Sequence, residues 1–145
     1  MESYDFSGLW YHVWTIGVII FVGGIASLLL SRFWVPGKLI KKQLITAIIL
    51  ILFSVGYSMY FVHKTYEPKI EICEGTLVRE KRYHRNAPLS WGYTFQDESG
   101  KKTWCCIDSI SRRTSVWPEG FEMGESYRVY YEADTDIIVK VEKIE

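Results

Sequence analysis

The chain has 145 residues, of which 48% are hydrophobic, and its 17 basic residues balance its 17 acidic ones. A neutral chain lacks the basic surplus that is typical of nucleic-acid-binding proteins, so we expect no nucleic-acid partner. The charged residues are unevenly spread, because residues 9–31 and 43–62 contain none. We therefore expect two apolar segments followed by a polar domain.

After a short tail at residues 1–8, the two apolar runs predict transmembrane helices at residues 9–31 and 43–63. Each run is long enough to cross a hydrocarbon core of about 30 Å as a helix. Aromatic residues stand at the ends of both runs, as at membrane–water interfaces, and we expect His12 to be an interfacial residue. Neither run carries a charged residue at mid-depth, which argues against a channel or a transporter. The acidic head of the chain argues against a cleaved signal peptide.

Small residues on the two runs predict where the helices approach each other closely. The link between the runs is short, so the helices are expected to be antiparallel, with a turn at Pro36 and Gly37. The small residues are Gly23, Gly24 and Ser27 on the first run and Ser54, Gly56 and Ser58 on the second.

The link at residues 32–42 predicts the orientation in the membrane. The tail at residues 1–8 contains acidic residues and no basic one, whereas the link is basic. By the positive-inside tendency the link is cytoplasmic, and the tail and the carboxy-terminal domain lie outside a bacterial inner membrane. The basic residues of the link are Arg32, Lys38, Lys41 and Lys42, and those that count against this orientation are Lys64, Lys69 and Arg79.

After a linker at residues 64–69, residues 70–145 predict a small β domain, because apolar residues now alternate with polar ones. The expected fold class is a membrane α-helical hairpin plus an all-β domain, an antiparallel five- to six-stranded barrel or rolled sheet of OB or SH3 size. The expected strands are 70–83, with a bulge or bend at Gly75, then 90–96, 101–109, 113–117, 125–133 and 137–144. Three sets are each expected to share one face: Trp91, Tyr93 and Phe95; Tyr127, Val129 and Tyr131; Ile137, Val139 and Val141.

Three cysteines, Cys73, Cys105 and Cys106, carry the most reactive side chains of this domain. Outside the cell, a disulfide can join Cys73 to one member of the adjacent pair, since neighbours in a strand point to opposite faces. Three reduced, packed thiols are the alternative. Metal-ligand spacing is missing and His84 is the single histidine of residues 70–145, so we expect no metal, no cofactor and no catalytic residue.

Residues 79–90 are rich in basic side chains and are expected to form a loop that contacts a protein partner or anionic headgroups. A solvated hairpin loop is the alternative. The residues expected to bind a partner are Arg79, Lys81, Arg82, Arg85, Trp91 and Trp104.

Short motifs of the β domain carry a family resemblance. They are Gly75-Thr76-Leu77-Val78, Tyr93-Thr94-Phe95 followed by Asp97 and Gly100-Lys101, and Gly124 followed by "YRVYYEADTD". In these motifs residues 70–145 resemble the bacterial family called domain of unknown function 3592, which implies a membrane-tethered small β domain without catalytic residues. Ala133 stands where that family has a proline, and both helices precede the domain. The chain is also similar in plan to the membrane-anchored OB-type domain of NfeD-like proteins.

The sequence thus predicts a non-enzymatic, membrane-anchored binding or scaffolding protein. Its expected partners are the lipid bilayer and a protein partner or a second copy of the chain. Two alternatives belong to other classes: a membrane immunity or defence accessory protein against a toxin, and a cysteine-based redox or metal-handling protein.

Overall fold

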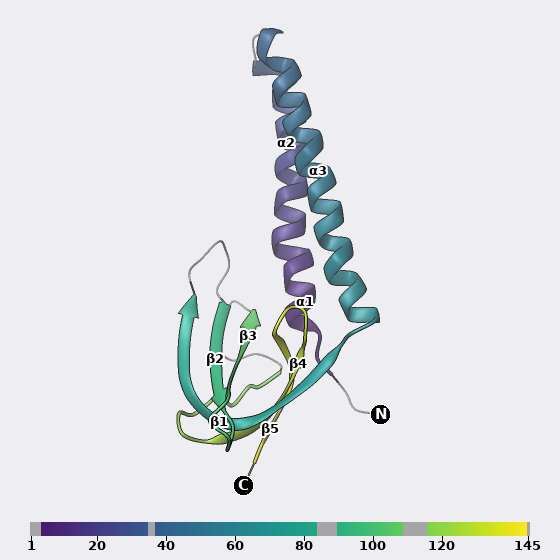
Figure 1. Ribbon diagram of the computed structural model, residues 1–145. Coiled ribbons are helices and arrows are strands. Elements are labelled where there is room, and N and C mark those ends of the chain that lie inside the picture. Colours follow the sequence, from purple (N-terminus) through teal and green to yellow (C-terminus); the bar gives the residue numbers. More distant parts are fainter. Residues whose placement is uncertain (1–3, 35–36, 84–89, 109–115, 145) are drawn as a thin grey trace.

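The computed structural model describes residues 4–34, 37–83, 90–108 and 116–144, which form a long helix pair on a small β structure (Figure 1). The first helical arm comprises α1 (Ser7–His12), a π-helical turn η1 (Val13–Gly17) and α2 (Val18–Trp34). The second arm is α3 (Gly37–Tyr66), which runs back antiparallel to the first. Both arms reach into the predicted link, because α2 ends at Trp34 and α3 begins at Gly37.

Both arms are long and apolar enough to cross a membrane. The apolar spans are Ser7–Leu30 and Lys41–Tyr66, with mean hydropathies of 2.4 and 2.1. Only 11% and 17% of their most apolar stretches are buried within the protein. The apolar side chains therefore face outward over most of the helix surface, unlike those of a helix in the core of a soluble protein.

Small residues do bring the two arms together, at some of the predicted positions. Gly24 is buried against α3, where a Cβ would lie 3.3 Å from the carbonyl oxygen of Ala47. The Ser54 hydroxyl donates a hydrogen bond to the carbonyl oxygen of Gly17, across 2.5 Å. The predicted contacts of Gly23 and Gly56 are wrong, because neither position has a neighbouring atom within 4 Å of a Cβ.

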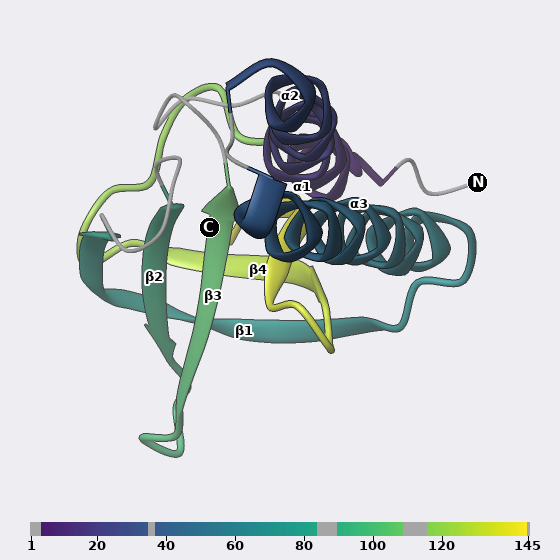
Figure 2. The same ribbon diagram turned by 90° about the horizontal axis from the view of Figure 1, so that it is seen from above.

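Five strands follow the helices and close into a ring. They are β1 (Ile70–Tyr83), β2 (Ser90–Gln96), β3 (Lys102–Asp108), β4 (Ser126–Glu132) and β5 (Ile137–Lys143). Their order around the ring is β1-β2-β3-β5-β4, and the long β1 pairs with β4 along its first half and with β2 along its second. Seen along the helices, β2 and β3 lie to one side of the base of the helix pair, and β1 runs from the end of α3 across to β2 (Figure 2).

The sheet is mixed, because β3 and β5 are parallel and meet at the pair Cys106 and Ile137. The prediction of a wholly antiparallel sheet is wrong at this contact. An odd number of strands that reverse direction one after another cannot close a ring without one parallel pair. The additional strand expected at residues 113–117 is not found at residues 116–117, and residues 113–115 lie outside the described residues.

The alternating pattern correctly predicted most of the ring interior. Tyr93 and Phe95 of β2 are completely buried there, and the partly buried Trp91 packs against the same cluster. The expected inner face of β4 is confirmed as well. The buried residues of this interior are Cys73, Leu77, Tyr93, Phe95, Cys105, Ile107, Phe121, Tyr127, Val129, Tyr131, Ile138 and Val141.

Strand β5 departs from the predicted alternation. Ile138 and Val141 lie in the ring interior, whereas Ile137 belongs to a second cluster that faces the helices. The register with β4 shifts at Val139, and such a bulge moves the following side chains to the other face. The prediction that Ile137, Val139 and Val141 share one face is therefore wrong.

Gly75 lies where β1 passes from β4 to β2. A Cβ at this position would lie 2.6 Å from the carbonyl oxygen of Gln96, so a residue without a side chain permits the close approach of the two strands. The irregularity in the pairing of β1 with β2 falls between Leu77 and Arg79. The expected bulge is therefore two to three residues after Gly75.

Candidate functional site: the helix–ring junction

The helix pair meets the ring through a small apolar cluster. Leu9 of α1 and Phe61 of α3 pack against Cys106 and Ile137 on the outside of the ring. A Cβ at Gly8 would lie 2.8 Å from the Cγ2 atom of Ile137, so the glycine lets α1 rest directly on β5. The cluster buries apolar surface from the helices and the ring together, which stabilises the junction.

His12 is the centre of a polar network inside this junction. Its Nε2 atom is hydrogen-bonded to Oδ2 of Asp108 at the end of β3, and its Nδ1 lies 2.7 Å from the hydroxyl of Tyr57 in α3. The imidazole also stacks on the ring of Phe61, with centroids 4.4 Å apart and planes at 5°. Because a carboxylate only accepts hydrogen bonds, Nε2 carries the proton and donates the hydrogen bond to Asp108. One histidine thus joins both helical arms to the sheet.

A second polar contact lies at the carboxy-terminal end of α3. Lys64 donates a hydrogen bond to Asp134 in the β4–β5 turn, and its Nζ is 3.6 Å from Oε1 of Glu132. The Glu132 side chain is completely buried, and its Oε2 accepts a hydrogen bond of 2.8 Å from the Thr135 hydroxyl. The hydrogen bond from Lys64 lowers the pKa of Asp134. A buried carboxylate near a lysine from another element fixes the position of α3 on the turn.

The amino-terminal segment adds a third contact between the parts. The backbone N–H of Asp5 donates a hydrogen bond of 2.8 Å to the carbonyl oxygen of Val139 in β5. The ring of Tyr4 lies 6.0 Å from that of Tyr130 in β4. The chain is therefore fastened to the outside of the ring before it enters α1.

The sequence did not predict that four residues would join the helices to the ring: Asp108, Tyr57, Lys64 and Glu132. The partners are far apart along the chain, since His12 and Asp108 are separated by 96 in residue number. The sequence held one signal for these contacts, a polar residue near the end of each apolar run. Placing such a residue in lipid costs free energy unless it has a polar partner, so its presence indicates a partner elsewhere in the chain. His12 is indeed at the interface end of its run, but its environment is a network and not open solvent.

The three cysteines lie in two different places. Cys73 and Cys105 are in the ring interior, whereas Cys106 packs against the helices, as the predicted alternation requires. All three are buried free thiols, and burial raises the pKa of each of them. If a disulfide forms within the chain, this arrangement favours Cys73 with Cys105. High thiol pKa values make these cysteines weak nucleophiles at neutral pH.

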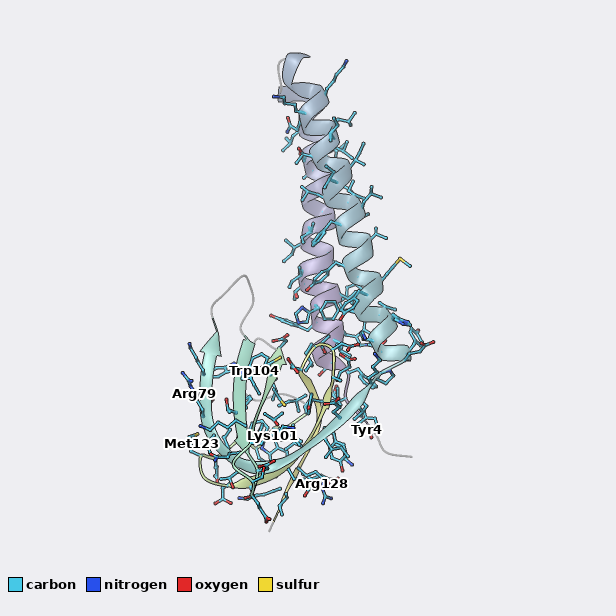
Figure 3. The ribbon with its side chains drawn as sticks, in the orientation of Figure 1. Tyr4, Arg79, Lys101, Trp104, Met123 and Arg128 are labelled. Carbon is cyan, nitrogen blue, oxygen red and sulfur yellow. The ribbon has the colours of Figure 1, made fainter. Side chains whose placement is uncertain are left out.

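The described residues expected to bind a partner are divided between the outer surface of the ring and its interior. Trp104 is 40% exposed on β3, and Arg79 is exposed on β1 (Figure 3). Lys81 is also exposed, whereas Trp91 packs against the ring interior. Arg82 lies in β1, and Arg85 lies outside the described residues.

The basic residues that predicted the orientation lie at the end of the helix pair remote from the ring. Lys41 and Lys42 are exposed near the start of α3, Lys38 precedes them, and Arg32 is near the end of α2. The ring and the amino-terminal segment share the opposite end (Figure 1). The arrangement agrees with a hairpin that has both chain ends on one side.

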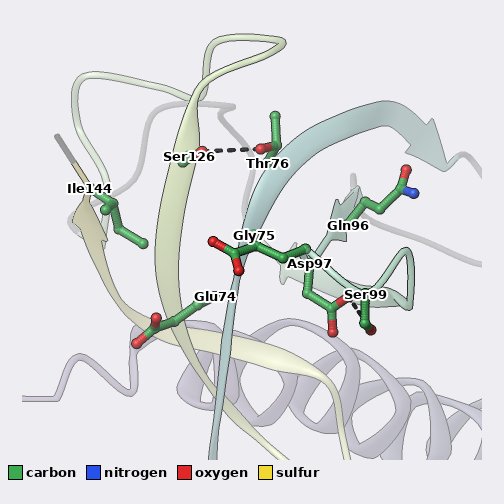
Figure 4. Close-up of a pocket in the computed structure, with 9 residues that line it drawn as sticks. Glu74, Gly75, Thr76, Gln96, Asp97, Ser99, Ser126 and Ile144 are labelled. Carbon is green, nitrogen blue, oxygen red and sulfur yellow. Dashed lines mark hydrogen bonds between the residues drawn. The ribbon is translucent and has the colours of Figure 1, made fainter.

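A polar cleft of about 560 Å³ opens at the end of the ring remote from the helices (Figure 4). Asp97 shapes one wall by accepting hydrogen bonds from the Ser99 hydroxyl and the Lys101 backbone N–H. Glu74 accepts a hydrogen bond of 2.5 Å from Arg128 beside it. Among the described residues, no group of three or more metal-ligating side chains is placed to hold a metal ion.

Comparison with known proteins found no matching family model, no matching curated protein and no matching solved structure. The resemblance to the family of domain of unknown function 3592 therefore stays a prediction.

Proposed function

We propose that this protein is a membrane-anchored binding module whose two helices cross a bacterial inner membrane. The helices hold a small OB-type barrel against the membrane surface, where it binds a protein partner or a second copy without catalysing a reaction. The ring and the amino terminus lie outside, and the link at residues 32–42 is cytoplasmic.

The outward-facing apolar surface of the helices supports the membrane part of this proposal. Exposed side chains on the two arms include Trp14, Ile19, Leu29, Leu52 and Met59, each more than 60% exposed. In water such a surface would favour aggregation, whereas a hydrocarbon environment suits it. The ring supports the proposal that the protein is a binding module. Its five strands, with a long β1 that pairs with two neighbours, suit an OB-type barrel, and this architecture is used for binding.

The observation that carries the proposal is the junction around His12. A flexible tether would suffice to keep a domain near a membrane, but this chain joins both arms to the ring through paired polar side chains. Fixed geometry of this kind serves to present a surface at a defined height and orientation. A binding module at the membrane is the function that best explains such a junction.

Membrane extraction and topology fusions test the proposal together. The full chain should stay in the membrane fraction during alkaline carbonate extraction. A carboxy-terminal alkaline phosphatase fusion should be active, while the matching green fluorescent protein fusion should stay dark. Release by carbonate would contradict the membrane anchor, and a fluorescent fusion would contradict the orientation.

A further inference from the structure

The outer face of β1, β2 and β3 carries a row of three paired residues. Arg79 of β1 pairs with Thr94 of β2, which pairs with Trp104 of β3. Directly paired residues of neighbouring strands point to the same face. Because Tyr93 and Phe95 on either side of Thr94 point into the ring, this row lies on its outer face. We name it the Trp104 row.

The same face continues into the helix–ring junction. Along β3, Trp104 is followed on this face by Cys106, which packs against Leu9 and Phe61 of the helices, and by Asp108, which binds His12. Two residues of a strand span about 7 Å, so Trp104 lies one strand repeat from the helix contact. The Trp104 row therefore extends sideways from the base of the helix pair, as Figures 1 and 2 show for β2, β3 and the second half of β1.

The length of helix above the junction brings this face to the membrane surface. Residues 13–30 form about 27 Å of helix at about 1.5 Å per residue, close to the roughly 30 Å of a hydrocarbon core. Little apolar helix is left to hold the ring away from the lipid. The junction at His12 therefore lies at the level of the headgroups.

Charge on this face complements an anionic surface. Arg79 and Lys81 of β1 and Lys102 of β3 are exposed, and β2 contains no charged residue. Asp108 on this face is held by His12. The carboxylates Glu74 and Glu142 are grouped around Arg128, elsewhere on the ring. An exposed indole beside cationic side chains suits the headgroup layer, where amphipathic rings and basic residues are favoured.

From these observations we propose that the Trp104 row, with Lys81 and Lys102, is a docking surface for anionic phospholipid headgroups. This inference rests on the membrane anchoring proposed above. The ring then lies with this face toward the bilayer, while the cleft at Asp97 lies beyond the edge of the face that is remote from the helices and is open to a partner.

Spin-label accessibility in vesicles tests the docking surface. The full chain carrying Thr94→Cys with a nitroxide label is reconstituted into phosphatidylcholine vesicles with and without phosphatidylglycerol. The matched control is Glu98→Cys, which places the label on the exposed turn at the remote end of the ring. With phosphatidylglycerol, the label at position 94 should be severalfold less accessible to a water-soluble nickel reagent than the label at 98. The unsubstituted chain gives the background, because its three cysteines are buried.

A charge-reversal variant checks the cause of that protection. Arg79→Glu with Lys81→Glu, added to Thr94→Cys, should restore nickel access at position 94 without changing the label at 98. Lys102→Cys repeats the measurement at a second position of the face. Equal nickel access at positions 94, 102 and 98 in phosphatidylglycerol vesicles would overturn the inference. Protection of position 94 that stays the same after charge reversal, and in vesicles without phosphatidylglycerol, would overturn it as well. Carbonate extraction of the same vesicles reports separately whether the helices are inserted, so failure of the anchor is distinguishable.

Discussion

At the scale of single residues, the bond between His12 and Asp108 joins parts of the chain that the sequence leaves far apart. Both side chains are mostly buried, with 17% and 8% of their surfaces exposed. Removing one member of such a pair leaves the other without its partner in a poorly solvated place. This pair is therefore the single contact whose loss should weaken the junction most.

We expect Asp108→Ala to lower the free energy of unfolding by about 1.5–3 kcal/mol, the typical contribution of a hydrogen bond to a charged group. Denaturant unfolding in detergent micelles, followed by near-ultraviolet circular dichroism, measures this change. The control is Glu98→Gln, which alters an exposed carboxylate and should change stability by less than about 0.5 kcal/mol. Equal stability of the two variants would contradict the assigned importance of the pair.

The buried thiols give a second prediction at this scale. Burial raises the pKa of Cys105 and Cys106 well above the ordinary value, so little thiolate forms at neutral pH. A membrane-impermeant maleimide should therefore label none of the three cysteines in the folded protein, and all of them after unfolding. Mass spectrometry of the labelled protein counts the adducts, and rapid labelling of folded protein at Cys106 would show that the junction is open.

At the scale of elements, the packing of α2 on α3 depends on one of two adjacent glycines. A Cβ at Gly24 would lie 2.8 Å from Ile51, whereas Gly23 faces open space. We expect Gly24→Val to destabilise the helix pair and Gly23→Val to be tolerated, because the first substitution forces the helices apart. Thermal unfolding in micelles compares the two variants, and equal loss at both positions would contradict the described helix contact.

The attachment of α3 to the β4–β5 turn should depend on pH. The hydrogen bond from Lys64 lowers the pKa of Asp134 below its ordinary 3.8, so the native state binds the Asp134 proton less readily than the unfolded state does. This contribution to stability is present above the ordinary pKa and is lost as the pH falls through the lowered one. Asp134→Asn should therefore reduce stability at pH 7 and flatten its loss below about pH 4. The measurement is the free energy of unfolding as a function of pH for the unsubstituted chain and for Asp134→Asn. Parallel curves for the two proteins below about pH 4 would contradict this expectation.

Local patterns predicted the elements well where each strand has one buried face. Tyr93 and Phe95 in β2 and Tyr127 and Val129 in β4 lie inside the ring because alternation is a local property. In β5 the bulge at Val139 ended the alternation, and its position depends on pairing with another strand. The parallel contact between β3 and β5 depends on ring closure, which no single segment contains.

At the scale of the whole molecule, the junction was beyond prediction from local patterns for the same reason. It is made by α1, α3, β3 and the β4–β5 turn, and each of the polar side chains that they contribute is ordinary in its own segment. His12 stood out in the sequence, but its carboxylate partner follows it by 96 residues. The fold of the ring brings Asp108 and the partners of Lys64 to the same end of the ring. Their contacts with His12 and Lys64 then fix the position of the helices.

We expect the helix pair and the ring to behave as one rigid body, because the contacts of His12 and Lys64 join them. Double electron–electron resonance between nitroxides at Lys42→Cys and Glu98→Cys, in reconstituted full chain, measures the distance from the remote end of the helices to the remote end of the ring. We expect a single narrow distance distribution, which broadens when Asp108→Ala and Lys64→Ala are added. A broad distribution in the chain with intact Asp108 and Lys64 would mean that the ring hangs on a flexible tether, and would contradict the rigid junction.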